Sequence, residues 1–191
     1  MNKEELRKKA LDTRNGMSES DILEKSRAIF EKLTGTDVYK DSENILIYVS
    51  FGSEVSTDEI ILDCLSQGKN VFCPRVTDKK GGIMEFVRIS YPEDLSEGYF
   101  HIMEPEITKD SILYEGQEAD RTLVVMPLVA FDEYRSRIGY GAGFYDRFLS
   151  RYPHVRTLAV AFECQRAAET IDKGLMDIRP QAIITENRIY Q

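Results

Sequence analysis

Apolar residues follow two different spacings along the chain, and each spacing predicts a different element. Over residues 3–14 they are sparse among charged side chains, and over 20–33 they recur every three or four positions behind Ser18 and Ser20. Both patterns predict helices, the second with a serine at its amino-terminal cap. Residues 45–49 form a continuous apolar run rich in β-branched side chains, which is typical of a buried strand. The chain therefore opens with two helices and a strand.

The same change of spacing recurs downstream. Ser56 or Thr57 begins a helix whose inner face is apolar, Gly68 ends it, and residues 71–73 start another strand. This strand–helix–strand unit predicts parallel pairing. Further strands are expected at 84–89, 122–126, 157–161 and 182–185, with an irregular stretch at 91–116, a short helix to Arg151 and a helical piece at 165–171. The alternation predicts one α/β domain over residues 1–191, with a mixed, mostly parallel sheet flanked by helices.

The composition narrows the class of partner. Of the 191 residues 42% are hydrophobic and 30% are charged, which is ordinary for a globular protein. The net charge of −8 argues against nucleic-acid binding and against attraction to an anionic membrane. No apolar run approaches the roughly 18 residues that span a membrane, and the N-terminus lacks the apolar core of a signal peptide. We expect a cytoplasmic monomer without nucleic-acid or membrane partners, and the charge does not exclude a small anionic ligand, which needs only a local basic pocket.

Cysteines and histidines are too few and too scattered for a metal cluster. Cys64, Cys73 and Cys164 each lie among apolar neighbours, which predicts buried thiols in a reducing compartment. The two histidines, His101 and His154, are assigned no role.

The most informative stretch is the string Arg-Ile-Gly-Tyr-Gly-Ala-Gly-Phe-Tyr-Asp-Arg at residues 137–147. Gly139, Gly141 and Gly143 alternate between a strand end and a helix, where backbone N–H groups can hold phosphate oxygens. Asp146 can hold a divalent metal near those phosphates. A strained turn with a surface Asp–Arg pair explains the loop equally well. The spacing matches neither the dinucleotide motif nor the P-loop.

Together with Pro-Leu-Val-Ala-Phe-Asp at 127–132, this string resembles the 5-formyltetrahydrofolate cyclo-ligase family, also called methenyltetrahydrofolate synthetases. The resemblance covers essentially the whole chain. Its other matching segments are Lys3 with Arg7, residues 53–57, 71–75 and 103–105, Gln165, and residues 177–186. The chain departs from the family at Ala142 and Phe144, where many members have Gly and Tyr. It also has Met176 in place of a frequent His and no proline before Asp177.

The resemblance implies the fold of ribose-5-phosphate isomerases and CoA transferases. It also implies ATP- and Mg²⁺-dependent conversion of 5-formyltetrahydrofolate to 5,10-methenyltetrahydrofolate. ATP would phosphorylate the formyl oxygen, N10 would attack the activated carbon, and phosphate would leave. Such chemistry needs positioning and charge neutralisation more than a covalent nucleophile, which suits a sequence with few histidines.

The resemblance also assigns residues to roles. The catalytic residues would be Arg137, Tyr145 and Asp146, and the metal ligands Asp146 and Asp177. The ATP site would comprise Lys3, Arg7, Arg137, Ile138, Gly139, Tyr140, Gly141, Ala142, Gly143, Phe144 and Tyr145. The folate site would comprise Val49, Glu54, Tyr140, Gly141, Ala142, Gly143 and Phe144.

Several alternatives stay open at this point. Lys3 and Arg7, four residues apart on one helical face, also fit a solvated surface. Glu54, just beyond the first strand, also fits a first-turn acid favoured by the helix dipole. The whole chain fits a sugar-phosphate isomerase that needs no nucleotide, or a catalytically silent folate-binding member of the family. Since residues 3–14 hold few apolar anchors, we expect the first helix to add little to the core.

Overall fold

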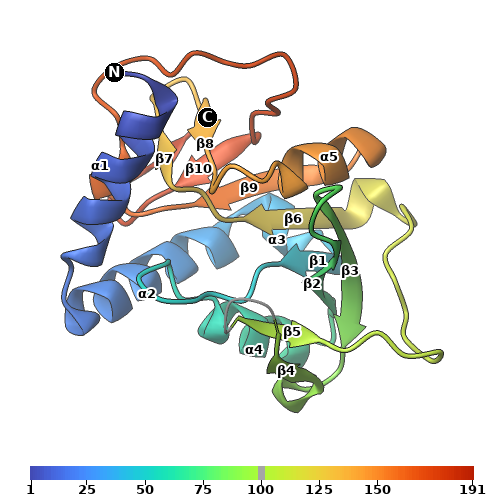
Figure 1. Ribbon diagram of the computed structural model, residues 1–191. Helices are drawn as coiled ribbons and strands as arrows, with labels where there is room; N and C mark the ends of the chain where they lie inside the picture. The colour runs from blue at the N-terminus through green and yellow to red at the C-terminus, as the bar shows by residue number, and fades with distance from the viewer. Residues whose placement is uncertain (99–101) are drawn as a thin grey trace.

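A seven-stranded sheet runs through the centre of the protein, in a computed structural model that describes residues 1–98 and 102–191 (Figure 1). The strand order is β11-β10-β9-β6-β1-β2-β3. Pairing is parallel from β10 to β2, whereas the edge strands β3 and β11 pair antiparallel. The bounds are β1 Asn44–Ile47, β2 Asn70–Asp78, β3 Ile83–Ile89, β6 Thr122–Met126, β9 Arg156–Val160, β10 Ala182–Ile184 and β11 Ile189–Tyr190. The predicted mixed, mostly parallel sheet is confirmed.

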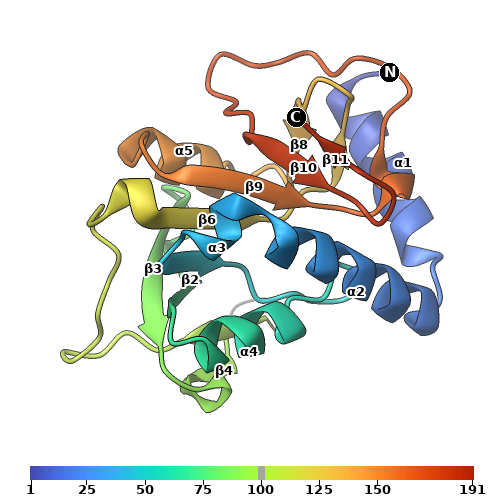
Figure 2. The same ribbon diagram turned by 180° about the vertical axis from the view of Figure 1, so that it is seen from behind.

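Helices cover both faces of this sheet, as the two opposite views show (Figures 1 and 2). They are α1 Lys3–Asn15, α2 Glu19–Gly35, α3 Asp37–Lys40, α4 Asp58–Ser66 and α5 Phe144–Arg151. Side chains of α2, α3 and α4 share one core cluster, and those of α5 belong to a second cluster on the other face. Because both faces are covered, every residue of β1 and β6 is buried. This explains why these strands read as continuous apolar runs.

The caps of α2 and α4 differ from each other. Ser18 caps α2 as expected, since its hydroxyl accepts a hydrogen bond of 3.1 Å from the Asp21 N–H. Thr57 occupies the amino-terminal cap position of α4, as predicted, but its side chain makes no capping hydrogen bond. Its hydroxyl accepts from the Ser50 N–H at 3.0 Å, and the Thr57 N–H donates to the Ser50 hydroxyl at 3.1 Å. These two bonds fix the ends of the loop that carries Glu54.

The helical piece predicted at 165–171 is wrong. Only a 3-10 turn, Glu163–Gln165, forms there. The chain beyond it bonds to another segment instead: the Ala167 N–H donates to the Phe131 carbonyl at 2.7 Å, and the Ile171 N–H donates to Oδ2 of Asp132 at 2.8 Å. The stretch expected to be irregular, 91–116, contains a short antiparallel pair, β4 Leu95–Glu97 with β5 Met103–Pro105. His101 lies outside the described residues.

The first helix contributes more to the core than its sequence suggests. Leu6 and Ala10 are 8% and 7% exposed and belong to a third apolar cluster. The other members of that cluster are Val129, Ala130, Ile138 and Ile171. Val129 and Ala130 follow β6, and Ile138 lies in the hairpin of β7 Ala130–Phe131 and β8 Arg137–Ile138. The helix therefore packs at the carboxyl end of β6, to the left in Figure 1.

Two further expectations concern the thiols and the membrane. All three cysteines are free thiols; Cys64 and Cys73 are buried as predicted, whereas Cys164 is only half-buried. Within the described part of the chain, no helix is both long and apolar enough to cross a bilayer.

Candidate active site

The candidate site lies where the chain leaves the carboxyl ends of β1 and β6. These strands are neighbours, but β1 leads to β2 on one side whereas β6 leads to β9 on the other. The following loops separate at this point, and open α/β sheets bind their ligands in the crevice that results. Glu54 belongs to the loop after β1, and the glycine loop, residues 139–143, follows β6. The helix α1 packs beside both.

The glycine loop has a backbone that only glycine adopts without strain. Gly141 and Gly143 have φ angles of 106° and 71°, and Gly143 is the amino-terminal cap of α5. A Cβ on Gly141 would lie 3.6 Å from Nη2 of Arg7, so this guanidinium faces the loop. Nε of Arg7 also donates to the Gly139 carbonyl at 2.9 Å. The structure thus brings Arg7 to the loop.

Arg137 and Asp146 form a largely buried ion pair beside the start of α5. Nη2 of Arg137 lies 2.6 Å from Oδ1 of Asp146, and the two side chains are 6% and 20% exposed. The backbone of Ile178 joins them, since its carbonyl accepts from Nε of Arg137 at 3.2 Å and its N–H donates to Oδ1 of Asp146 at 2.9 Å. Both bonds to Asp146 reach Oδ1, so Oδ2 accepts none from residues 1–98 or 102–191.

Asp177 is paired with Lys3 across the mouth of the site. Nζ of Lys3 lies 2.5 Å from Oδ2 of Asp177, and the Gly174 N–H donates to the same oxygen at 2.9 Å. Burial alone would raise the pKa of Asp177. The hydrogen bonds from Lys3 and Gly174, with the charges of Lys3 and Arg137, outweigh burial and hold that pKa below its ordinary value. Two of the predicted site residues are therefore in direct contact, although no motif links them.

Glu54 and Tyr140 connect the loop after β1 to the glycine loop. The Tyr140 hydroxyl donates to Oε1 of Glu54 at 2.8 Å, and the Phe51 N–H donates to Oε2 at 3.2 Å. Glu54 is only 4% exposed, and this burial raises its pKa. The bonds from Tyr140 and Phe51 and the charge of Arg14 oppose the rise. Val49, which is buried, lies just beyond β1 at the base of the same loop.

Sequence reasoning missed Arg14. It is 4% exposed, and its Nη2 donates to the Tyr140 hydroxyl at 2.8 Å. The signal that points to it is helical spacing: Lys3, Arg7, Ala10 and Arg14 share one face of α1. Because Ala10 on this face of α1 is buried, Arg14 on the same face also packs against the rest of the protein.

Tyr145 offers a hydroxyl to the site. Its oxygen is buried and has no hydrogen-bond partner among the described residues. Burial and the charge of Glu54 raise the pKa of Tyr145 far above its ordinary value, although Arg137 opposes the rise. The hydroxyl therefore stays protonated.

The donor set suits polyphosphate better than a resident metal. Arg7 bonds to the loop at Gly139, Lys3 lies one turn before Arg7 on α1, and α5 begins at Gly143, an arrangement that suits phosphate oxygens. Within the parts of the chain described here, no three or more His, Cys, Asp or Glu side chains are grouped to hold a metal. A divalent cation would need ligands from a bound phosphate as well as from Asp146 or Asp177.

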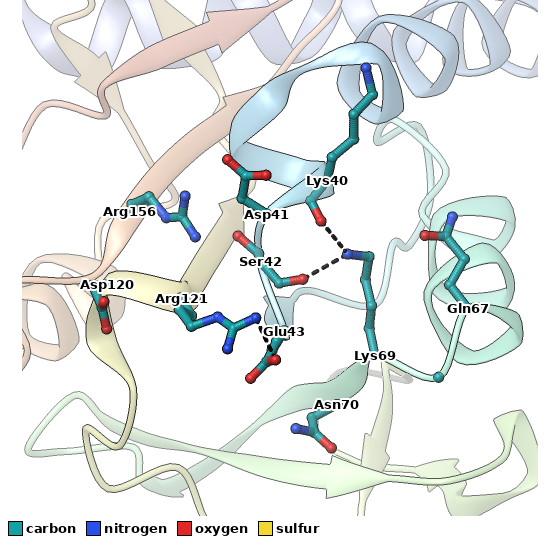
Figure 3. Close-up of a pocket in the computed structure, with 11 residues that line it drawn as sticks. Lys40, Asp41, Ser42, Glu43, Gln67, Lys69, Asn70, Asp120, Arg121 and Arg156 are labelled. Atoms are coloured by element: carbon teal, nitrogen blue, oxygen red, sulfur yellow. Dashed lines mark hydrogen bonds and ion pairs between the residues drawn. The ribbon is translucent and has the colours of Figure 1, made fainter.

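A cavity of about 950 Å³ opens at the opposite end of the strands, where β1, β2, β6 and β9 begin (Figure 3). Two of its cations are already engaged. Nζ of Lys69 donates to the carbonyls of Tyr39, Lys40 and Ser42, and Arg121 pairs with Glu43. The cavity is separate from the glycine loop and from the site described above.

Comparison with known proteins gives one family. Residues 1–185 match the sequence profile of the 5-formyltetrahydrofolate cyclo-ligase family. A 5-formyltetrahydrofolate cyclo-ligase of Haemophilus influenzae is 32% identical over 145 residues, which cover 73% of this chain and 76% of that protein. The enzyme of the same name from Escherichia coli K12 is 28% identical over 152 residues, covering 78% of this chain and 81% of the other.

Solved structures agree with this result. The structure of Aquifex aeolicus 5,10-methenyltetrahydrofolate synthetase superimposes with a TM-score of 0.84 at 28% identity, over 100% of this chain and 93% of that one. A 5,10-methenyltetrahydrofolate synthetase from Mycoplasma pneumoniae, at 21% identity, has the same fold with a TM-score of 0.75, over 97% of this chain and 99% of its own. The chain belongs to the 5-formyltetrahydrofolate cyclo-ligase family.

Proposed function

We propose that this protein uses ATP and Mg²⁺ to convert 5-formyltetrahydrofolate into 5,10-methenyltetrahydrofolate, with release of ADP and phosphate. One observation carries the proposal: the Tyr140 hydroxyl joins a phosphate-binding type of loop to a buried carboxylate, at 2.8 Å from Glu54. A nucleotide on the loop and a pterin on Glu54 would therefore lie side by side. The names of the relatives supply the substrate class.

The ATP site rests on the geometry of the glycine loop. The backbone of residues 138–144 offers N–H groups at the amino-terminal end of α5, and the missing Cβ of Gly141 lets a phosphate chain approach closely. Beside Gly143 the space is taken by Arg147, whose Nη1 would lie 2.9 Å from a Cβ there and adds a third cation at the loop. Arg7 already faces the loop, and Lys3 can turn from Asp177 to a phosphate oxygen, since their pair is about a third exposed at 38% and 31%. Both cations would form charge-assisted bonds to the phosphates.

Two carboxylates fit a magnesium ion bound together with ATP. Mg²⁺ in nucleotide sites is held by one or two carboxylates, phosphate oxygens and water. Asp146 keeps Oδ2 and Asp177 keeps Oδ1 without a hydrogen bond from the described residues. When bound, the ion would neutralise charge on the phosphates.

The folate site rests on Glu54. An ionised carboxylate accepts hydrogen bonds from the amino and ring N–H groups of a pterin, and the Tyr140 ring, 45% exposed, offers a surface beside it. Residues 141–144 would lie between the nucleotide and the pterin, and Val49 would lie at the base of the loop that carries Glu54.

The chain's own residues then account for the reaction. The formyl oxygen attacks the γ-phosphorus and ADP leaves. Arg137, which is paired with Asp146, would neutralise charge on the transferred phosphoryl group. N10 next attacks the activated carbon and loses its proton, the C–O bond breaks so that phosphate leaves with the former formyl oxygen and that proton, and the methenyl bridge closes. The protonated Tyr145 hydroxyl is available to donate a hydrogen bond to the oxygen that accepts charge.

The decisive experiment mixes the protein with MgATP and 5-formyltetrahydrofolate and follows the methenyl absorbance together with ADP. We expect one ADP for each methenyl product. Product formed at full rate without nucleotide would refute the ATP-dependent mechanism. Sugar-phosphate isomerisation without ATP binding would favour the isomerase alternative, and folate binding without turnover would favour a silent member. Size-exclusion chromatography tests the accompanying proposal of a monomer.

A further inference from the structure

We propose that Arg14 is a positioning residue for the folate: it holds the Tyr140 hydroxyl so that this group and Glu54 present one fixed surface to the pterin. The inference rests on the proposed function, because it assigns Glu54 to the folate. It adds a residue that contacts neither substrate in its own right. The Tyr140 hydroxyl bonds both to Arg14 on α1 and to Glu54 in the loop after β1, so it connects two buried charged side chains.

Two hydrogen bonds from Arg14, and two more made by its partners, define the geometry around this side chain. Its Nη2 donates to the Tyr140 hydroxyl at 2.8 Å, and that hydroxyl donates to Oε1 of Glu54 at 2.8 Å. Its Nε donates to the Ser53 hydroxyl at 3.0 Å, and Ser53 donates in turn to Oδ1 of Asn15 at 2.5 Å. The guanidinium carbon lies 5.9 Å from the centre of the Tyr140 ring. Arg14 thus fixes both the loop of Glu54 and the tyrosine that reaches it.

The charge of Arg14 is costly for a purely structural residue. The side chain is 4% exposed, and its hydrogen-bond partners are two neutral hydroxyls rather than a carboxylate. Burying an ion without a directly paired counter-ion is unfavourable, and an apolar side chain would fill the space at lower cost. The nearest compensating charge is Glu54, one hydroxyl away. A substrate that binds to Glu54 through its N–H groups benefits from the same alignment.

Among the described residues, Arg14 is the one cation that acts on Glu54. Tyr140 donates a hydrogen bond to this carboxylate from the glycine loop, whereas Tyr145 on α5 and Tyr48 after β1 interact with it only electrostatically, and all three tyrosines are neutral. Arg14 approaches from α1. Burial raises the pKa of Glu54, and the charge of Arg14 lowers it. Loss of Arg14 must therefore raise this pKa further, so the carboxylate protonates, and folate binding weakens, at a higher pH.

The test measures kcat and both KM values over a pH series for Arg14→Gln and Arg14→Lys. We expect Arg14→Gln to raise the KM for 5-formyltetrahydrofolate about tenfold at neutral pH, the size expected for one charge-assisted bond. The KM for ATP should change by no more than about twofold. Arg7 on the same helix would contact the nucleotide, but Arg14 lies about two turns farther along α1. The acid limb of the folate profile should move to higher pH, and Arg14→Lys should restore part of that shift because it keeps the charge.

A double-substitution cycle separates positioning from packing. If Arg14 acts through Tyr140, the Arg14→Gln effect on the folate KM must shrink in a Tyr140→Phe background. The matched control is Lys8→Gln, an exposed cation on the opposite face of α1, which should change neither KM.

Three outcomes overturn the proposal: an unchanged folate KM, an equal rise of both KM values, or additive effects in the cycle. If Arg14→Gln does not fold, Arg14→Lys decides through its pH profile, which must still differ from that of the unaltered protein. Calorimetric titration of 5-formyltetrahydrofolate keeps this test apart from the proposed function. Folate binding that weakens in the variants supports the role of Arg14 even if the unaltered protein shows no turnover.

Discussion

Replacing Lys3 and Arg7 by methionine removes two charges from α1 and keeps most of their side-chain length. These residues are the farthest in sequence from the glycine loop, and Arg7 is 132 residues from the carbonyl that it contacts. The double substitution asks whether α1 belongs to the nucleotide site or merely lies beside it.

The cost in stability follows from the contacts that are lost. The Lys3–Asp177 pair is about a third exposed, with side chains at 38% and 31%, and such pairs contribute about 0–1 kcal/mol. The bond from Arg7 to the Gly139 carbonyl contributes about 1 kcal/mol more. For a protein of this size, a loss of about 1–2 kcal/mol lowers Tm by roughly 2–8 °C. The apolar contacts of Leu6 and Ala10 are unaffected, so the helix stays docked.

The cost in ATP affinity is larger. A charge-assisted bond to phosphate contributes roughly 1.5–3 kcal/mol, but Lys3 must first release Asp177. We expect the KM for ATP to rise at least about tenfold, with a smaller change in the KM for folate. Stabilisation by MgATP depends on affinity and should shrink in parallel. The assay therefore combines ATP titration of the rate with thermal unfolding, with and without MgATP, and uses Lys8→Met as the matched control.

The result that would refute this reasoning is an unchanged KM for ATP together with an undiminished thermal shift. Lys3 and Arg7 would then be a solvated helix face. Equal increases in the KM values for ATP and folate would point instead to a displaced glycine loop.

Two further predictions concern the carboxylates. Asp146→Asn keeps an oxygen that can accept from Arg137 and Ile178, but it removes the charge that a metal ion needs. We therefore expect kcat to fall about a hundredfold or more, while the free energy of unfolding falls by only about 1–3 kcal/mol. A near-normal kcat at low Mg²⁺ would contradict the metal role. Because the pKa of Asp177 lies below its ordinary value, its pair with Lys3 stabilises the folded state above about pH 4 and is lost as the pH falls. The Tm difference between the unaltered protein and Asp177→Asn should therefore shrink as the pH falls below about 4, and a difference that stays constant from about pH 7 to the lowest pH at which the protein is folded would exclude this contribution.

The sequence predicted the central strands well because their burial is local information. Residues 122–126 are apolar or β-branched at every position, and β6 has these bounds. The segment at 165–171 failed for the opposite reason. Its composition allows a helix, but Phe131 and Asp132 offer its N–H groups partners that lie far away in sequence. A local pattern cannot reveal such competition.

The site was predictable in part for the same reason. The glycine string and its family resemblance identified the loop, and the structure places Arg7, Glu54 and Asp146 around it. The Lys3–Asp177 contact joins residues 174 positions apart, so no spacing could have shown it. Arg14 was missed because charge alone suggested solvent, although its helical phase with Ala10 indicated burial.

The strand order also dictates when each part of the protein can fold during synthesis. The central pairing of β1 with β6 joins Asn44 to Thr122, which are 78 residues apart, so it must wait until that much more chain has been made. The parallel unit of β1 and β2 and its antiparallel neighbour β3 have all their residues much earlier. The helix α1 packs on Val129 and Ile171, which are synthesised more than a hundred residues after it, and it is therefore among the last elements to dock. Binding competence must then arise late in folding, when α1 meets these much later segments of the nascent chain.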